Sequence, residues 1–376
     1  MNEGVAETKN FWISFLSKIF IVIFYFLILI LFLYIPKIFR FMISDKKVIN
    51  VYVFSDIISY KTVKEFEKKT GISVNLKYFD ANNELISKFR INKGKGYDLI
   101  TVSDFAVDIL RSKKLLQKID ISKISNFKYL DKRFLGKYFD PKNDYSVPCF
   151  WSLYGIIYNK NKFKILEDLN VDMNWSFVFK DPKKILPQSD YKICMIQAPR
   201  DSIYLAAIHL FGKVDNLSEK ELEQIRELLI EQKRWVEIYM LGSLQYYLLG
   251  EVVSLAVTES VYAQKILEIS DEFDFVVPKE GSVFSIENLA IPVLSEKSDL
   301  SLQFIDFLIS KEVCLENSLE YGYNPVNVES CKKIGKKILE HKSFFPEEKM
   351  FDRLHLVPND IGIKRIEKLW SSIKLS

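Results

Sequence analysis

Cysteine and histidine side chains are the first candidates for metal or redox chemistry, and their spacing in this chain argues against both. The four cysteines form no close pair and the three histidines lie far apart: Cys149, Cys194, Cys314, Cys331, His209, His341 and His355. Because zinc and dithiol sites need ligands at short, regular spacing, we expect no metal site and no cofactor. We interpret the cysteines as small apolar side chains. Whether Cys314 and Cys331 pair depends on geometry that the sequence leaves open.

The motifs of several large enzyme classes are absent. The chain has no P-loop, no nucleophile elbow, no HExxH motif and no GxGxxG that opens a helix. Scattered Asp and Glu residues could act in general acid–base catalysis, but nothing in the sequence brings two of them together with a nucleophile or a metal. The sequence therefore predicts a binding protein and not an enzyme.

One polar residue follows a predicted buried strand. Residues 97–102 form an apolar run of the buried-strand type, and Ser103 comes directly after it. Open α/β sheets bind their ligands beyond the carboxyl ends of the strands. Ser103 is therefore a candidate ligand contact.

The elements that must position such residues alternate between strands and helices. Strand patterns cover residues 51–54, 72–76, 97–102, 273–277 and 288–293. Helical patterns surround Val63, Leu85 and Leu302, with Gly71 as a stop signal and Asn83 as a cap. Ser218 and Glu221 have the spacing of a capping box that opens a charged helix through about Met240. This alternation predicts α/β layers.

Length and charge narrow the function further. With 376 residues and 48% apolar content, the chain can bury two cores. No Gly/Ser-rich linker separates them, so we expect the chain to cross between two lobes more than once. The first 47 residues account for +3 of the net charge of +4, and the remainder is nearly neutral. No basic stripe stands out, so we expect no nucleic-acid partner.

Residues 19–36 form an uncharged apolar run, close to the minimum length of a membrane-spanning helix. No small-residue cleavage site ends the run, and no lipid-accepting cysteine follows it. We therefore expect an uncleaved N-terminal transmembrane anchor. The flanking charges favour a cytoplasmic C-terminal part, because Lys37, Arg40, Lys46 and Lys47 follow the span. A long segment can nevertheless translocate largely regardless of such charges.

Seven segments in order resemble the spermidine/putrescine-binding proteins, the polyamine-binding components of ABC importers. The segments are 65–71, 96–100, 115–120, 140–148 with Trp151, 277–281, 288–292 and 322–327, and the match extends over most of residues 50–365. The resemblance implies a periplasmic-binding-protein type II fold, with two α/β lobes and a ligand cleft between them. We expect an N-terminal tail and anchor over 1–47, lobe 1 over 48–150 with 288–330, and lobe 2 over 151–287 with 331–376.

The resemblance also implies the ligand positions. In the first lobe, a family run of an aromatic, a hydroxyl and an acid corresponds to Phe54, Ser55 and Asp56, with its tyrosine replaced by Ile57. The family's Ser-x-Tyr corresponds to Ser103 and Phe105, which keeps the ring and loses the hydroxyl.

In the second lobe the acids are partly kept and the tryptophans are lost. Asp201 retains the second acid of the family's Asp-x-x-Glu, and Glu287 retains the acid of its Trp-x-Asp. A pocket tryptophan falls at about Thr258, with Glu259 beside it. We expect Asp56, Asp201 and Glu287 to converge on the cleft, where they would repel one another unless a cation joined them.

The resemblance therefore implies a monomeric receptor that binds a cationic small molecule. A polyamine is the favoured ligand, and a different amine is the next candidate. It would dock on ABC permease subunits at the periplasmic face of the inner membrane, anchored by its N-terminal helix. Two alternatives remain open. One is a receptor of the same fold for a different small solute, and the other is a membrane-tethered interaction protein that has lost ligand binding.

Overall fold

The computed structural model describes residues 18–21, 23–32, 34–35, 47–240, 242–334 and 341–376. The chain divides into one unit of residues 1–48 and 71–73 and a second unit of residues 49–70 and 74–376. In the first unit, residues 18–21, 23–32 and 34–35 are helical and largely exposed. Among the described residues, no helix is both long enough and apolar enough to cross a membrane. The predicted span over 19–36 includes positions 22, 33 and 36, which lie outside the described residues, so the anchor stays a prediction.

The described strands join in one mixed sheet. They are β1 (Val48–Phe54), β2 (Ser73–Phe79), β3 (Leu99–Ser103), β4 (Ser146–Asn159), β5 (Ile193–Ile196), β6 (Val236–Met240), β7 (Leu255–Glu259), β8 (Phe273–Val276), β9 (Ser282–Ala290), β10 (Asn324–Pro325) and β11 (Leu354–Leu356). The main order is β2-β1-β3-β9-β4-β7-β5-β6, and β10 and β8 pair with β4 while β11 pairs with β9.

Strand β4 connects the two halves of this sheet. Its first part pairs antiparallel with β9, up to Leu153 opposite Phe284. From Tyr154 onward it pairs with β7 and β8 instead. We call β1, β2 and β3 the first strand group and β5, β6 and β7 the second strand group. Almost the whole of β4 is buried, as expected for a strand covered on both faces.

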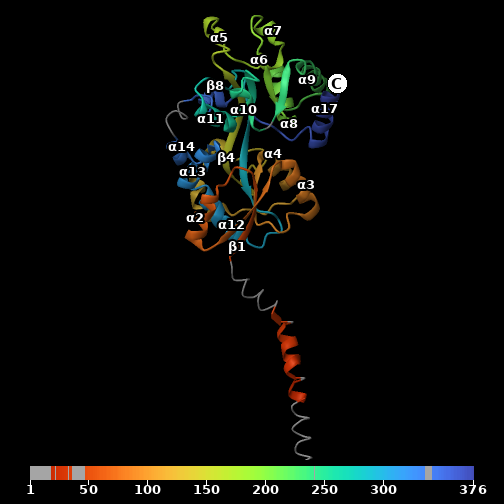
Figure 1. The fold of residues 1–376 in the computed structure, drawn as a ribbon, viewed down its shortest axis with the longest axis vertical. Helices are drawn as coiled ribbons and strands as arrows, with labels where there is room; N and C mark the ends of the chain where they lie inside the picture. The colour runs from red at the N-terminus through yellow and green to blue at the C-terminus, as the bar shows by residue number, and fades with distance from the viewer. Residues whose placement is uncertain (1–17, 22, 33, 36–46, 241, 335–340) are drawn as a thin grey trace, which may run out of the picture. The chain divides into compact units, whose positions relative to one another are not determined.

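Helices pack around both strand groups, as Figure 1 shows for α3 and α4 near β1 and for α8, α9 and α17 in the other half. The α-helices are α2 (Tyr60–Thr70), α3 (Asn82–Asn92), α4 (Asp104–Ser112), α5 (Ile165–Asp168), α6 (Ser176–Phe179), α7 (Pro182–Ile185), α8 (Pro199–Phe211), α9 (Glu219–Gln232), α10 (Leu244–Leu249), α11 (Ser260–Ile269), α12 (Ser298–Leu308), α13 (Lys311–Tyr321), α14 (Val328–Cys331), α16 (Glu348–Phe351) and α17 (Ile363–Leu375). Three short 3₁₀ turns are η1 (Ile121–Lys123), η2 (Ser125–Tyr129) and η3 (Lys132–Phe134).

Local signals explain several boundaries. The predicted capping box is confirmed, since the Ser218 side chain accepts from the Glu221 amide while the Glu221 carboxylate accepts from the Ser218 amide. The predicted length of this helix is wrong, because α9 ends at Gln232 and the next residues enter β6. The alternating sequence of β6 pairs in parallel with β5, and that pairing overrides the helical charge pattern.

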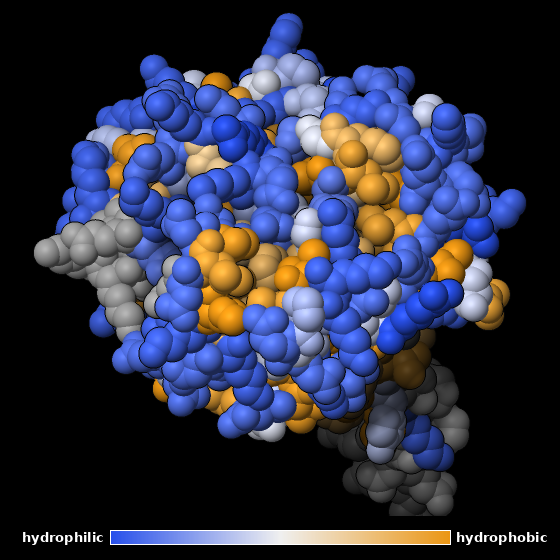
Figure 2. All heavy atoms as spheres, turned by 90° about the horizontal axis from the view of Figure 1, so that it is seen from above, coloured by the Kyte–Doolittle hydropathy of each residue, from blue (hydrophilic) through white to orange (hydrophobic). Residues whose placement is uncertain are grey.

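The second strand group has its own apolar core. Apolar side chains of β5, β7 and α8 contribute to it together with those of α6, α9 and α17, and Trp175, Ile193 and Tyr204 are among the fully buried members. The Trp175 indole donates to the Gly281 carbonyl at 2.8 Å, which satisfies the one polar atom of that ring. Viewed from the end that carries α5 and α7, the surface is mostly hydrophilic, and apolar atoms gather in separate places (Figure 2).

The cysteines lie in the interior as predicted from their apolar character. Cys149, Cys194 and Cys314 are buried, and Cys331 is partly buried. All four are free thiols, so Cys314 and Cys331 do not form a disulfide in this structure.

We expect Gly155→Ala to destabilise the protein. A Cβ atom at Gly155 would lie 2.6 Å from the Val276 carbonyl oxygen, in the part of β4 that pairs with β8. Relieving this contact would require a shift of the backbone, so the free energy of unfolding should fall by about 1–3 kcal/mol. Thermal melting measures it, with Gly242→Ala as the control, because nothing lies within 4 Å of a Cβ there. Equal melting temperatures for the two variants would contradict the close approach of β4 and β8.

Candidate functional site

A pocket of about 340 Å³ lies between side chains of the two strand groups. It is lined by Phe54, Asp80, Ala81, Asn82, Asn83, Phe105, Tyr154, Gln197, Ala198, Pro199, Arg200, Asp201, Glu259, Ile363, Ile366 and Glu367. Phe54 ends β1 and Phe105 lies in the first turn of α4, whereas Asp201 lies in the first turn of α8 and Glu259 ends β7. Both halves of the sheet therefore supply walls to one pocket.

The Tyr154 hydroxyl joins two carboxyl groups of this pocket. It lies 3.2 Å from Asp201 Oδ2 and 3.1 Å from Glu259 Oε1. A single hydroxyl proton can be donated to only one of these acceptors at a time. The second Glu259 oxygen accepts from the Ser152 hydroxyl at 2.8 Å. Asp201 and Glu259 are thus held side by side, with part of their hydrogen-bonding capacity left for a ligand.

The register of β4 explains why these side chains meet. Tyr154 lies opposite Glu259 of β7, and Ser152 lies opposite Ser285 of β9. Residues two apart on a strand point to the same face, so the side chains of Ser152 and Tyr154 lie on the same face of β4. Ser152 also contacts the Ser285 hydroxyl at 3.1 Å. Strand β4 thus presents a polar face, formed by Ser152 and Tyr154, in an otherwise apolar sheet.

Four carboxyl groups in this region have raised pKa values. Burial raises the pKa of Asp201 and of Glu259, and Asp201 adds to the effect on Glu259 by charge repulsion. Burial together with repulsion by Asp104 and Glu259 raises the pKa of Glu287 to about 8. Burial raises the pKa of Asp104 to about 6, although the Arg200 charge opposes that shift. Among the described residues, no lysine or arginine forms an ion pair with any of the four.

The structure brings four of the predicted positions close to the pocket. Phe54, Phe105 and Asp201 line it, and Glu287 lies near enough to Glu259 for charge repulsion. Ser103 is buried, and its hydroxyl has no partner among the described residues.

The other predicted positions lie elsewhere. Asp56 is exposed in a turn, with a left-handed φ of +60°, and is not part of the pocket lining. The Ser55 hydroxyl donates to Asp80 Oδ1 at 3.0 Å. Thr258 is buried and precedes Glu259 on β7, so its side chain points away from the face that carries Glu259. The expected convergence of Asp56, Asp201 and Glu287 is therefore incomplete, since Asp56 lies outside.

Sequence reasoning missed three polar members of this region. Tyr154, Glu259 and Asp104 all interact with the carboxyl cluster, as described above. The alternation of β7 is a signal that could have preferred Glu259 over Thr258, because only one of two neighbouring strand residues can face the pocket.

Arg200 is the fourth missed residue, and it brings a positive charge into the pocket. Its guanidinium carbon lies 4.3 Å from the centre of the Phe105 ring. Its Nη2 donates to the carbonyl oxygens of Val357 at 2.6 Å and Pro358 at 3.3 Å. The Val357 oxygen also accepts from the Tyr138 hydroxyl at 2.7 Å.

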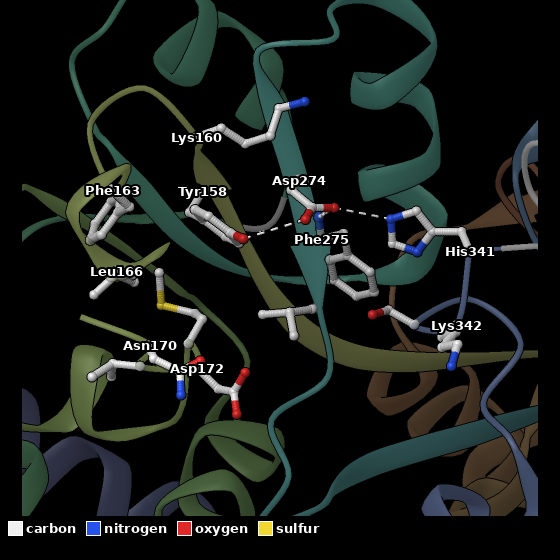
Figure 3. A pocket seen from close by; sticks show the side chains of 14 residues that line it. Tyr158, Lys160, Phe163, Leu166, Asn170, Asp172, Asp274, Phe275, His341 and Lys342 are labelled. Carbon is white, nitrogen blue, oxygen red and sulfur yellow. Dashed lines mark hydrogen bonds and ion pairs between the residues drawn. The ribbon is translucent and has the colours of Figure 1, made fainter. Parts of the chain in front are cut away.

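A second, larger hollow of about 680 Å³ lies beside β8. Figure 3 shows Asp274 between Tyr158 and His341, with Lys160 and Lys342 at the rim. The Tyr158 hydroxyl donates to Asp274 Oδ2 at 3.3 Å, and His341 Nε2 lies 3.0 Å from Asp274 Oδ1. Asp274 is thus already bound to neighbouring side chains, and Asp172, the other acid of the lining, pairs with Lys279, so this hollow is the weaker candidate for a cation site.

Comparison with known proteins identifies the class. Residues 61–337 match the family of bacterial extracellular solute-binding proteins, so the chain belongs to this family. This confirms the predicted class, since members of such a family bind solutes for transport and are not enzymes. The structure shows a periplasmic-binding-protein-like α/β fold, which confirms this part of the predicted fold class, whereas the two lobes with their bounds and the N-terminal transmembrane helix stay predictions.

Two relatives with similar sequences are named as polyamine-binding periplasmic proteins. The chain is 28% identical over 321 residues to a spermidine/putrescine-binding periplasmic protein of Salmonella typhimurium, covering 85% of this chain and 88% of the relative. It is 27% identical to a putrescine-binding periplasmic protein of Pseudomonas aeruginosa, covering 88% and 93%. These matches confirm the resemblance seen in the sequence segments.

Solved structures agree with these relatives. A protein of Listeria monocytogenes described as a spermidine/putrescine ABC transporter superimposes with a TM-score of 0.76 at 28% identity, covering 88% of this chain and 98% of that one. A spermidine/putrescine substrate-binding protein of Streptococcus pneumoniae superimposes with a TM-score of 0.75 at 24% identity, covering 88% and 99%.

Glu287→Gln should flatten the pH dependence of stability in the unliganded protein. A folded pKa of about 8, above the ordinary 4.5, means that Glu287 keeps a proton which the unfolded chain releases. The resulting stabilisation is fully present below about pH 4.5 and is lost as the pH rises through about 8. Between these values the group contributes a slope of up to about 1.4 kcal/mol per pH unit. Denaturant unfolding from pH 5 to pH 9 should show a smaller loss for the variant.

The matched control is Glu231→Gln on the exposed face of α9, which should follow the wild type. Identical slopes in all three proteins would mean that Glu287 is ionised in the folded protein at neutral pH, contrary to its raised pKa.

Proposed function

We propose that this chain binds a polyamine, such as putrescine or spermidine, or a related cationic amine, and delivers it to an ABC importer. One observation carries the proposal: Tyr154 holds Asp201 and Glu259 together in a pocket, and no lysine or arginine among the described residues pairs with them. Two adjacent carboxylates repel each other, and a cation placed between them removes that repulsion. The relatives whose names specify spermidine and putrescine support the same ligand class.

The pocket offers an amine both kinds of contact that it needs. Asp201 and Glu259 would accept charge-assisted hydrogen bonds from an ammonium group. The Phe54 ring at the pocket wall would pack against methylenes or against the positive charge. Phe105, Ser55, Ser103 and Glu287 remain proposed positions of the same site, supported for Phe105 by its place in the pocket lining and for Glu287 by its proximity to Glu259, whereas the predicted positions Asp56 and Thr258 do not face this pocket.

Ligand binding would act through closure of two lobes. We propose lobe 1 over 48–150 with 288–330 and lobe 2 over 151–287 with 331–376. The change of partners along β4 between Leu153 and Tyr154 supports a boundary close to the proposed one. Because Phe54 and Glu259 come from opposite strand groups, an amine that contacts both would favour the closed arrangement.

We further propose that residues 48–376 lie on the periplasmic side of the inner membrane and act as a monomer docked on permease subunits. The family of extracellular proteins supports the side of the membrane. The uncharged run over 19–36 supports an N-terminal anchor.

Asp201→Asn and Glu259→Gln should each weaken amine binding by at least about a hundredfold. Removing one charge from a buried ion pair typically costs about 3–5 kcal/mol. Calorimetric titration with putrescine and with spermidine measures the loss, and Glu231→Gln serves as the charge-matched control. Unchanged affinity in natively folded variants would contradict the site. If neither amine binds the wild type, native mass spectrometry of the purified protein would separate a receptor for another solute from a protein without a ligand.

Alkaline phosphatase fused after residue 376 should be active in intact cells if the folded unit lies outside the cytoplasm. The enzyme needs the oxidising periplasm to form its disulfides. A cytoplasmic reporter at the same position should be silent. The reverse pattern would overturn the proposed localisation and favour the orientation that the flanking charges predict.

A further inference from the structure

We propose that Arg200 is a positioning residue of the binding mechanism: its guanidinium links the two halves of the sheet beside the pocket and so slows the release of a bound solute. We call its contacts with Phe105 and the Val357 carbonyl, together with the contact of Tyr138 with that carbonyl, the latch. The proposal rests on the proposed function only in that a solute binds between the two halves, whichever amine it is. Arg200 lines the pocket from the first turn of α8, directly before Asp201.

The first contact of the latch joins Arg200 to a ring from the other half of the sheet. Helix α8 follows β5 of the second strand group, whereas Phe105 lies in α4, which follows β3 of the first strand group. The guanidinium carbon of Arg200 lies 4.3 Å from the centre of the Phe105 ring, a distance at which a cation is attracted to the ring. Separation of the two halves would break this contact.

The Val357 carbonyl forms the second link of the latch. Its oxygen accepts from Arg200 Nη2 at 2.6 Å and from the Tyr138 hydroxyl at 2.7 Å. A carbonyl oxygen has two lone pairs, so it can accept both hydrogen bonds at once. Arg200 and Tyr138 therefore share one acceptor.

The two ends of this link are fixed to different halves. Tyr138 lies before β4, and Asp140, two residues later, accepts from the Ser146 amide at 2.8 Å, at the start of β4. That part of β4 pairs with β9, the neighbour of β3. On the other side, the Tyr204 hydroxyl of α8 donates to Asp360 Oδ1 at 3.1 Å, which holds the segment of the shared carbonyl beside α8. The hydrogen bond from Tyr138 thus crosses between the halves.

The latch acts on the movement of the two halves and not through a contact of Tyr138 with the solute. Tyr138 is not part of the pocket lining, so the loss of its hydroxyl would leave that lining unchanged. The net contribution of one neutral hydrogen bond corresponds to about a two- to tenfold change in an equilibrium constant. Removal of either link should favour the open arrangement by about that factor and let a bound solute leave faster.

Distance measurement by electron paramagnetic resonance tests the movement without any solute. Spin labels at Ser87→Cys in α3 and Lys220→Cys in α9, both exposed positions, report the separation of the two halves. The two latch variants, Arg200→Met and Tyr138→Phe, should each raise the ratio of long to short distances by about two- to tenfold relative to wild type. Wild type that is labelled without the two cysteine substitutions gives the contribution of its native thiols.

Release of radiolabelled putrescine on rapid dilution tests the effect on retention. Both latch variants should release it about two- to tenfold faster, whereas association should not become slower. Because Arg200 and Tyr138 bond to the same carbonyl, the double variant should accelerate release by less than the product of the two single effects. A general loss of structure would instead lower the amount of putrescine bound.

The matched controls are Arg234→Met and Tyr246→Phe at exposed positions, which should follow wild type in both measurements. An unchanged distance distribution or an unchanged release rate in a natively folded latch variant overturns the proposal. If Arg200→Met does not fold, Tyr138→Phe decides alone, because it removes only one hydroxyl. Failure of wild type to bind putrescine would contradict the proposed amine-binding function, and the distance measurement would still decide the role of Arg200.

Discussion

Carboxyl groups that are partly removed from water need a partner, and this protein brings the half-buried Asp201, Glu259 and Glu287 and the buried Asp104 into one region. Tyr154 is the centre of that arrangement, because its hydroxyl lies within hydrogen-bonding distance of both Asp201 and Glu259. Burial and repulsion between neighbouring carboxyl groups raise the pKa of Glu259 and of Glu287, and no lysine or arginine of the described residues forms an ion pair with either. A ligand cation would pair with these carboxyl groups, and the free energy of that pairing would contribute to the affinity for the ligand.

The crossing strand makes this cluster possible. A strand that paired with only one strand group would present its alternate residues to that half of the sheet only. Strand β4 changes its partners between Leu153 and Tyr154, so its polar face is shared by the two halves of the sheet. Ser152 consequently contacts both Glu259 of β7 and Ser285 of β9. Because the same strand links both halves, a change in their relative position would alter the distances within the cluster.

Sequence patterns anticipated the fold better than the site. Most of the apolar run predicted over 97–102 lies in β3, which also includes Ser103, and the capping box at Ser218 is confirmed, because both depend on neighbours in sequence. The carboxyl cluster depends on contacts between residues 47 and 105 positions apart, which no local pattern encodes. The offset between Thr258 and Glu259 shows the consequence: an error of one residue on a strand moves the assigned side chain to the opposite face.

An internal cation changes what the retained acids mean. Acids at a ligand position are usually taken as a measure of the ligand's positive charge. Here Arg200 already acts on Asp104 and Asp201, so part of the negative charge serves the folding of the pocket itself. The same arginine covers Phe105, one of the two rings of the family pattern that the first lobe keeps. The number of acids therefore overstates the negative charge available to a ligand, because one arginine already lies beside them.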